Sequence, residues 1–418
     1  MLLAAVAASG FMLGRQSPVL FAAPPFFKDV VLESGTIQHE GARGAAWGDY
    51  DNDGDPDLFI AGEGDASRLY RNNGDGTFED VTKQAGIMQT RSASSAVFGD
   101  FDNDGCRDLY VANEAVREQG TPDTLYRSNC DGTFTDVSRS AGLTEAYNTY
   151  GVALADYDKD GFLDIYVANH GEFREAAVVY EPNILYRNNG DFTFTNVTRE
   201  AGVEGIPHCP GLKPSSDTQP NREAIGGPFK WSYQPVWLDY NNDGWPDLFV
   251  ATDNNVSPLY RNNGNGTFTE ATEEALLCRM GTGMGVAVGD FNSDGWLDMY
   301  VTNDGPNYLW ENNRDGTFWE VGRLAEVADE DSIGWGTEFF DYDNDGDLDL
   351  YVANGTVGER QVVLMLDKLY RNEGDGKFVQ VAAREGISGN YAKEGSAIAD
   401  YDGDGFADIL TLPAPGTQ

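Results

Sequence analysis

One acidic loop of nine residues occurs seven times in this chain, and it limits the possible folds more than any other feature. Each copy carries oxygen-bearing side chains at positions 1, 3, 5 and 9 and a glycine at position 6. The copies begin at Asp49, Asp100, Asp156, Asp239, Asp290, Asp341 and Asp400. Carboxylates held this close repel one another, and a Ca²⁺ ion that takes six to eight oxygen ligands at about 2.3–2.6 Å removes that repulsion. The pattern therefore predicts up to seven Ca²⁺ sites.

The predicted ligands are the side chains at positions 1, 3, 5 and 9 and the backbone carbonyl at position 7, where the residue types share no chemistry. Asparagine stands at position 3 of the fourth and fifth loops and keeps a carbonyl oxygen. In chain order, with position 7 given fourth in each loop, the predicted ligand residues are Asp49, Asp51, Asp53, Asp55 and Asp57; Asp100, Asp102, Asp104, Cys106 and Asp108; Asp156, Asp158, Asp160, Phe162 and Asp164; Asp239, Asn241, Asp243, Trp245 and Asp247; Asp290, Asn292, Asp294, Trp296 and Asp298; Asp341, Asp343, Asp345, Asp347 and Asp349; Asp400, Asp402, Asp404, Phe406 and Asp408.

These loops differ from EF-hands, which need a bidentate glutamate at position 12 and a helix on each side. Position 12 here is isoleucine, valine or threonine. After each loop the chain runs as Asp-Leu-Tyr-Val-Ala (108–112) or a close variant, and this β-branched and aromatic content is typical of a strand. Each site is therefore expected to close at position 9, where a strand begins.

The loops recur at intervals of 51, 56, 83, 51, 51 and 59 residues, and a period near 50 predicts a propeller or a solenoid. Four strand-like pieces fit each period: a small-residue strand before the loop, the strand after it, and a hairpin such as residues 69–78 (Leu-Tyr-Arg-Asn-Asn-Gly-Asp-Gly-Thr-Phe). Its Asn-Gly and Asp-Gly pairs suit tight turns. We therefore predict an all-β fold, a seven-bladed β-propeller over residues 24–418 with a calcium loop in each blade.

Only six such hairpins accompany the seven loops, with repeats of the first at 125, 185, 259, 309 and 369. Residues 27–30 (Phe-Lys-Asp-Val) match residues 78–81 (Phe-Glu-Asp-Val). A strand near residues 26–31 is therefore expected to complete the last blade and to remove an exposed sheet edge. The third strand of that blade has no candidate, so either the blade has three strands or the chain is a truncated product.

The start of the chain and its cysteines favour export. Residues 2–13 are apolar, and we predict a signal peptide over residues 1–23, although the basic n-region is missing. No later run approaches the 18 apolar residues of a membrane span. Low-affinity calcium sites suit the millimolar calcium outside cells. We expect a secreted or cell-surface protein, extracellular or periplasmic.

The four cysteines are predicted to form two disulfides. Cys106 and Cys130 both interrupt repeat positions of the second repeat, which favours a bond between two turns on one face. Cys209 and Cys278 would tie an insertion to the end of the next blade. Free buried thiols are the alternative for both pairs.

The formal net charge of −41 excludes one class of partner. The loop aspartates account for 26 of the 69 acidic residues (five loops of four and two of three). Seven bound Ca²⁺ ions would still leave a charge of about −27. Because so acidic a surface repels phosphate backbones, we expect no nucleic-acid binding.

The repeated sequence resembles a known family. Gly-Asp-Tyr-Asp-Asn-Asp-Gly-Asp (48–55) together with the hairpin at 69–78 is similar to the FG-GAP/VCBS repeats of integrin α-subunit propellers, and most of all to the cartilage acidic protein/UnbV group. The resemblance covers roughly residues 26–412. It implies a seven-bladed propeller, Ca²⁺ in the blade loops, and adhesion or extracellular binding. The ASPIC/UnbV segment usual in that group does not occur in this sequence, which fits truncation.

The strand order places the calcium loops and the hairpin turns on one face of the propeller. The other connections lie on the opposite face, called here the insertion face, and its long irregular segments are residues 113–124, 169–183, 203–235 and 354–368. Because binding residues commonly lie on loops held by a rigid frame, we expect a non-catalytic module that binds an extracellular glycan or protein there.

The alternative is a calcium-dependent polysaccharide lyase or hydrolase on the same scaffold. His170 and His208 fall in the insertions, and Glu172, Glu175 and Glu181 lie near the first of them. The sequence contains no nucleophile motif, zinc-ligand spacing or phosphate loop that would support this alternative.

Overall fold

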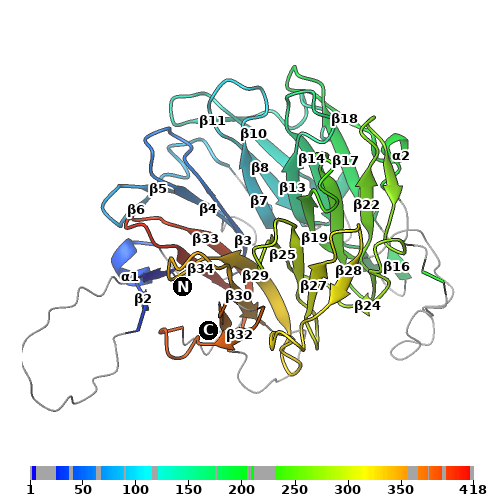
Figure 1. The fold of residues 1–418 in the computed structure, drawn as a ribbon. Coiled ribbons are helices and arrows are strands. Elements are labelled where there is room, and N and C mark those ends of the chain that lie inside the picture. Colours follow the sequence, from blue (N-terminus) through cyan, green and yellow to red (C-terminus); the bar gives the residue numbers. More distant parts are fainter. Residues whose placement is uncertain are drawn as a thin grey trace, which may run out of the picture.

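Seven four-stranded antiparallel sheets are arranged around a common axis in a β-propeller (Figure 1). The computed structural model describes residues 2–5, 25–36, 41–62, 67–88, 91–114, 121–174, 177–179, 181–204, 207, 209–210, 231–355, 366–374, 376–387 and 392–414. The prediction of an all-β propeller is confirmed.

Six of the sheets are blades that each form from one stretch of chain, with the strands in chain order from one edge of the sheet to the other. In chain order these blades consist of β3 (Ala42–Gly48), β4 (Asp57–Gly62), β5 (Arg68–Asn72) and β6 (Phe78–Asp80); β7 (Ala93–Gly99), β8 (Asp108–Asn113), β10 (Thr124–Ser128) and β11 (Phe134–Asp136); β13 (Thr149–Ala155), β14 (Asp164–Asn169), β17 (Ile184–Asn188) and β18 (Phe194–Asn196); β19 (Ser232–Leu238), β20 (Asp247–Thr252), β22 (Leu259–Asn262) and β23 (Phe268–Glu270); β25 (Val286–Gly289), β26 (Asp298–Val301), β27 (Tyr308–Asn312) and β28 (Phe318–Glu320); β29 (Gly334–Phe340), β30 (Asp349–Asn354), β31 (Lys368–Asn372) and β32 (Phe378–Gln380).

The prediction of seven blades needs a correction, because only six blades arise from single repeats. The seventh sheet is composite: β33 (Lys393–Ala399) pairs with β34 (Asp408–Pro413), β34 pairs with β1 (Leu2–Ala5), and β1 pairs with β2 (Phe27–Asp29). The reason is that the seventh repeat contains only its first two strands. β2 lies within residues 26–31, and β1 occupies the third position, for which the sequence offered no candidate. Residues 2–5 also fall within the proposed signal peptide, which stays a prediction.

The remaining short elements all lie in connections of the insertion face. They are the pairs β9 (Thr121–Pro122) with β12 (Ala146–Tyr147), β15 (Glu172–Arg174) with β16 (Ala177–Val179), and β21 (Asn255–Val256) with β24 (Met280–Gly281), and the helices α1 (Val31–Ser34) and α2 (Thr198–Ala201). No helix in the described stretches is long and apolar enough to cross a membrane.

The first strands of the sheets contact one another in a ring: β3 with β7, β7 with β13, β13 with β19, β19 with β25, β25 with β29, β29 with β33, and β33 with β3. The small residues predicted for these strands have a physical cause in this close approach. A Cβ atom on Gly151 would lie 2.0 Å from the carbonyl oxygen of Tyr233, and one on Gly285 would lie 2.1 Å from that of Trp335. A larger residue at either position would push neighbouring blades apart.

Both predicted disulfides are confirmed. Cys106 bonds to Cys130 and Cys209 bonds to Cys278, and none of the four cysteines is free. The first links the second acidic loop to the hairpin turn of its own blade. The second ties the long insertion to the segment that follows β23.

Candidate metal centres

The first aspartate of each loop holds the loop closed through the backbone. In the first loop Asp49 accepts hydrogen bonds from the N–H groups of Asp53 and Gly54, both at 3.0 Å. Loops two to six repeat this pair of bonds, and in the seventh Gly405 donates to Asp400. The position 6 glycines have φ between 88° and 98°, a backbone conformation that side chains disfavour. The invariant glycine is thereby explained.

The surroundings of the aspartates at position 3 show whether the loops could hold a cation. One carboxylate oxygen of each is buried and has no hydrogen-bond partner in four loops: Asp51, Asp102, Asp158 and Asp343. In the same four loops this aspartate and two other loop carboxylates place oxygens within 4.8 Å of one another. A buried unpaired carboxylate oxygen is unfavourable, and one Ca²⁺ ion can bind several oxygens at this spacing. The residues therefore fit the predicted ion.

The aspartate at position 9 is fully buried at the start of the second strand of each sheet. In the first loop both Asp57 oxygens accept backbone hydrogen bonds, from Tyr50 at 3.0 Å and from Asn72 at 2.8 Å. Burial raises the pKa of Asp57, Asp108, Asp247 and Asp349 to about 7 and the pKa of Asp164 and Asp298 to about 8. A bound cation would favour the charged form of these carboxylates, which burial disfavours.

Some loops carry less uncompensated charge than others. In the fourth loop the Asn241 amide donates to Asp243 at 3.0 Å, and in the fifth Arg314 forms an ion pair with Asp294 at 2.9 Å. In the second loop Arg127 pairs with Asp102. These arginines were not foreseen, because they come from the hairpin and reach the loop only in the folded blade.

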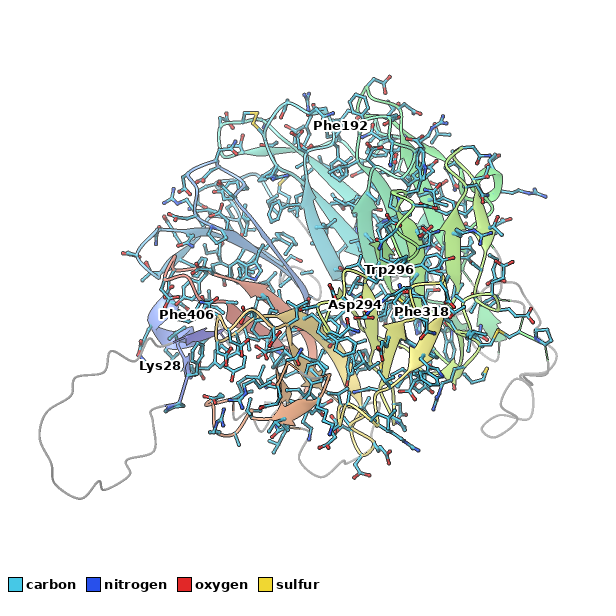
Figure 2. All side chains as sticks on the ribbon, viewed as in Figure 1. Lys28, Phe192, Asp294, Trp296, Phe318 and Phe406 are labelled. Carbon is cyan, nitrogen blue, oxygen red and sulfur yellow. A yellow bond between two sulfur atoms is a disulfide. The ribbon has the colours of Figure 1, made fainter. Side chains whose placement is uncertain are left out.

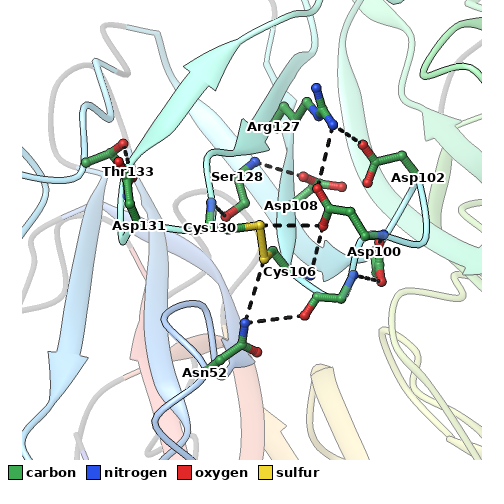
Figure 3. The surroundings of a disulfide bond; sticks show 12 residues. Asn52, Asp100, Asp102, Cys106, Asp108, Arg127, Ser128, Cys130, Asp131 and Thr133 are labelled. Carbon is green, nitrogen blue, oxygen red and sulfur yellow. Dashed lines mark hydrogen bonds and ion pairs between the residues drawn. A yellow bond between two sulfur atoms is a disulfide. The ribbon is translucent and has the colours of Figure 1, made fainter.

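The residue at position 7 turns its side chain toward the hairpin turn of the same blade. A Cβ on Gly190 would lie 2.8 Å from the Phe162 ring, and one on Gly374 would lie 2.9 Å from an oxygen of Asp347. In the second blade the Cys106–Cys130 disulfide replaces this contact (Figure 3). Phe406, in the seventh loop, lies beside the composite sheet that carries Lys28 (Figure 2). A backbone ligand at position 7 stays a prediction.

Neighbouring loops are also linked to each other. The asparagine at position 4 has positive φ in four loops, and its amide donates to the carbonyl oxygen of the position 6 glycine in the next loop. These bonds join Asn52 to Gly105, Asn103 to Gly161, Asn242 to Gly295, and Asn344 to Gly405, at 2.8–3.3 Å. These bonds join the first three acidic loops to one another, the fourth loop to the fifth, and the sixth loop to the seventh.

Within a loop the ligands should contribute unequally. We expect Asp345→Ala to remove one bound Ca²⁺, because it deletes a charged ligand whose Oδ1 also accepts the N–H of residue 347 at 3.0 Å. Asp347→Ala is expected to keep all of them, because that side chain faces Gly374. Calorimetric Ca²⁺ stoichiometry measures both variants, and equal losses would show that position 7 was misinterpreted.

Two of the groups suggested for catalysis, His170 and Glu181, lie within the described residues, and both are engaged in packing or hydrogen bonding. His170 lies between the rings of Tyr150, at 4.6 Å, and Trp231, at 5.3 Å, and burial lowers the pKa of its imidazole to about 4. Glu181 is buried and accepts the backbone N–H of Asn148. His208 and Glu175 lie outside the described residues, as does the side chain of Glu172. His170 is therefore a neutral packing residue at physiological pH.

A cavity of about 480 Å³ lies between the first strands of the sheets, at the ends that face away from the acidic loops. Its wall includes Tyr150, Tyr233, Trp335 and Glu338. The Tyr233 ring packs edge-on against His170 at 5.0 Å and against Trp335 at 5.9 Å. The sequence reasoning missed this cavity. A comparison of the repeats at the positions six and three residues before each loop could have indicated the cavity.

Comparison with known proteins decides the family. Five stretches match the FG-GAP-like repeat: residues 49–111, 100–167, 239–301, 290–352 and 358–411. Together they cover more than half of the chain. The chain belongs to the FG-GAP-like repeat family. The FG-GAP resemblance seen in the sequence is thereby confirmed, and the matched stretches begin at the first aspartate of a calcium loop in four of the five cases.

This FG-GAP-like repeat protein is also homologous to cartilage acidic protein 1. It is 24% identical to the mouse protein over 395 residues, which are 88% of this chain and 56% of the relative. The human protein is 24% identical over 397 residues, 88% and 55% of the two chains. The chain thus spans about half the length of the curated relatives it matches.

Two solved structures resemble this chain at low sequence identity. A complex of BBS1N with ARL6DN soaked with mercury matches with a TM-score of 0.50 at 11% identity, over 91% of this chain and 96% of that one. An Agrocybe aegerita lectin specific for non-reducing terminal N-acetylglucosamine matches with a TM-score of 0.46 at 18% identity, over 84% and 82%. At 11% identity the likeness to the BBS1N complex concerns the fold alone.

Proposed function

We propose that this protein is a secreted, calcium-binding propeller that holds an extracellular glycan or protein without catalysis. The observation that carries the calcium part is the buried, unpartnered oxygen of Asp51, Asp102, Asp158 and Asp343. Each of these aspartates also places a carboxylate oxygen within 4.8 Å of oxygens from two other carboxylates of the same loop. All seven loops would take Ca²⁺ through the residues given above, and the ion would supply charge compensation and rigidity.

We further propose that the composite sheet acts as a seventh blade and closes the ring. β33 contacts both β29 of the sixth blade and β3 of the first, as the first strands of the other sheets contact their neighbours. Ring closure removes exposed edges on the inner strands. This arrangement would also keep the hydrogen bond from Asn344 of the sixth loop to Gly405 of the seventh.

Secretion is supported by the chemistry of the chain. Two disulfides use all four cysteines, and disulfides persist in oxidising compartments. The homology to cartilage acidic protein 1, a protein named for cartilage, is compatible with this proposal. A binding role is favoured over the lyase or hydrolase because His170 is buried and its pKa is lowered, which removes the one described histidine that an acid or base mechanism would use.

The insertion face is the proposed binding surface, and shortening its longest loop tests this. The variant replaces residues 211–230 with a short Gly-Ser connector, so that the Cys209–Cys278 bond and β19 are both kept. The unaltered protein is tested on a panel of immobilised neutral and acidic polysaccharides. We expect it to be retained by a polysaccharide of this panel without cleaving it. The shortened variant should then bind its best polysaccharide at least tenfold more weakly, about 1.4 kcal/mol.

A matched control alters the opposite face. The Asn263 amide donates to Thr267 within an exposed hairpin turn, so Asn263→Ala should leave polysaccharide binding unchanged. Release of new reducing ends or unsaturated products would favour the enzyme. Loss of binding in the turn variant, with normal binding by the shortened loop, would assign function to the calcium face instead.

A further inference from the structure

One residue position on the first strands carries a different type of side chain in the sixth blade than in the other sheets. Three positions before each calcium loop, six of the seven first strands carry alanine or valine: Ala46, Val97, Ala153, Val236, Ala287 and Ala397. The sixth blade carries Glu338 there, on β29. Of these seven residues Val97, Ala397 and Glu338 line the cavity, and a carboxylate beside apolar side chains is unfavourable unless something compensates its charge.

No described protein group compensates the charge of Glu338. Among the described residues its carboxylate forms no hydrogen bond and no ion pair, and the half-buried side chain lines the cavity. Burial raises the pKa of this carboxyl to about 8. The other two cavity carboxylates differ, because Glu114 and Glu394 lie 3.2 Å and 3.7 Å from the Arg43 guanidinium.

The remaining wall is suited to an organic cation. Trp335 and Tyr233 stand six positions before their loops, at the end of the cavity nearer the insertion face, and Trp47 lies deeper in the lining. Aromatic faces attract cations, and three glutamates against one arginine leave the cavity negative when Glu338 is ionised. The protein's charge of −41 also concentrates cations at such an opening.

We propose that the central cavity binds an aliphatic primary ammonium group, such as the end of a lysine side chain or of a polyamine, with Glu338 as its counter-ion and Trp335 and Tyr233 as its aromatic wall. A cavity of about 480 Å³ is in the size range of small-molecule sites. This site goes beyond the proposed function, because it concerns a separate ligand and would stand even if the insertion loops bound nothing.

The test is calorimetric titration of the calcium-loaded protein with 1,5-diaminopentane. The titration is run at pH 9, where Glu338 is ionised and an alkylamine is still largely protonated, and in about 0.15 M salt to screen exposed charges. We expect one saturable site, at least tenfold weaker binding to Glu338→Gln, and no measurable binding of the neutral isostere 1,5-pentanediol.

Two further variants keep the result interpretable. Glu338→Ala introduces the residue that four of the other first strands carry at this position, so it should fold and also lose diamine binding. Glu326→Gln removes one exposed carboxylate outside the cavity and should bind like the parent protein. Equal diamine affinity of the parent and both Glu338 variants would overturn the proposal. Binding of the diol as tight as that of the diamine would also overturn it, and would indicate a site for neutral polar chains.

Discussion

Removing calcium with excess EDTA is expected to lower the melting temperature by roughly 10 °C. If each loop binds Ca²⁺ with a Kd of about 0.1 mM, then 1 mM Ca²⁺ stabilises the fold by roughly 1.4 kcal/mol per site, or on the order of 10 kcal/mol over seven independent sites. An unfolding entropy of about 2.1 cal/mol/K per residue converts this energy into the stated shift. The four unpartnered Asp oxygens at position 3 are the groups whose compensation would be lost.

The measurement is a thermal melt followed by circular dichroism, with the metal content determined separately to show that calcium has left. Adding Ca²⁺ back should restore the melting temperature. Mg²⁺ should restore less, because it demands a tighter octahedral shell. An unchanged melting curve in a protein shown to be free of metal would contradict the calcium assignment.

Much of the fold could be predicted because each repeat encodes its own local structure. The glycine at position 6 and the turn pairs of the hairpins set backbone conformations that need no partner from elsewhere in the chain, as the positive φ of Gly54 and Gly74 illustrates. The disulfide partners were predictable for a related reason. Cys106 stands at position 7 of its loop, and Cys130 replaces the glycine of the hairpin turn. In the first, third, fourth and sixth blades the residues at these two positions lie against each other.

The rest could not be predicted because it depends on contacts between distant segments. Residues 2–5 lack the Leu-Tyr-Arg-Asn pattern of the other third strands, and their pairing with Leu410 follows only from ring geometry. His170 was a candidate acid or base until the folded chain placed it between Tyr150 and Trp231. The interpretation of Glu338 likewise requires knowing which side of β29 faces the cavity.

Replacing Phe27 is expected to have the second largest effect. Phe27 is 1% exposed on β2, and it packs in a cluster with Tyr342, Ile387 and Ile409 that joins the sixth blade to the composite sheet. Phe27→Ala should therefore destabilise the protein by about 3–5 kcal/mol, the usual range for truncating a buried phenylalanine. The backbone hydrogen bond from residue 27 to Glu385, at 2.8 Å, is kept in this variant. The effect thus reports on side-chain packing, and urea unfolding followed by fluorescence measures it.

Lys28→Ala is the matched control, because Lys28 is the next residue on the same strand. Its side chain forms an exposed ion pair with Glu33 at 2.6 Å. Such surface pairs contribute at most about 1 kcal/mol. If β2 closes the ring, Phe27→Ala should also speed amide hydrogen exchange in β32 and around Ile387, since the sixth blade would lose its covering strand. Equal stability of the two variants, with unchanged exchange in the sixth blade, would mean that the composite sheet is not needed to hold the propeller together.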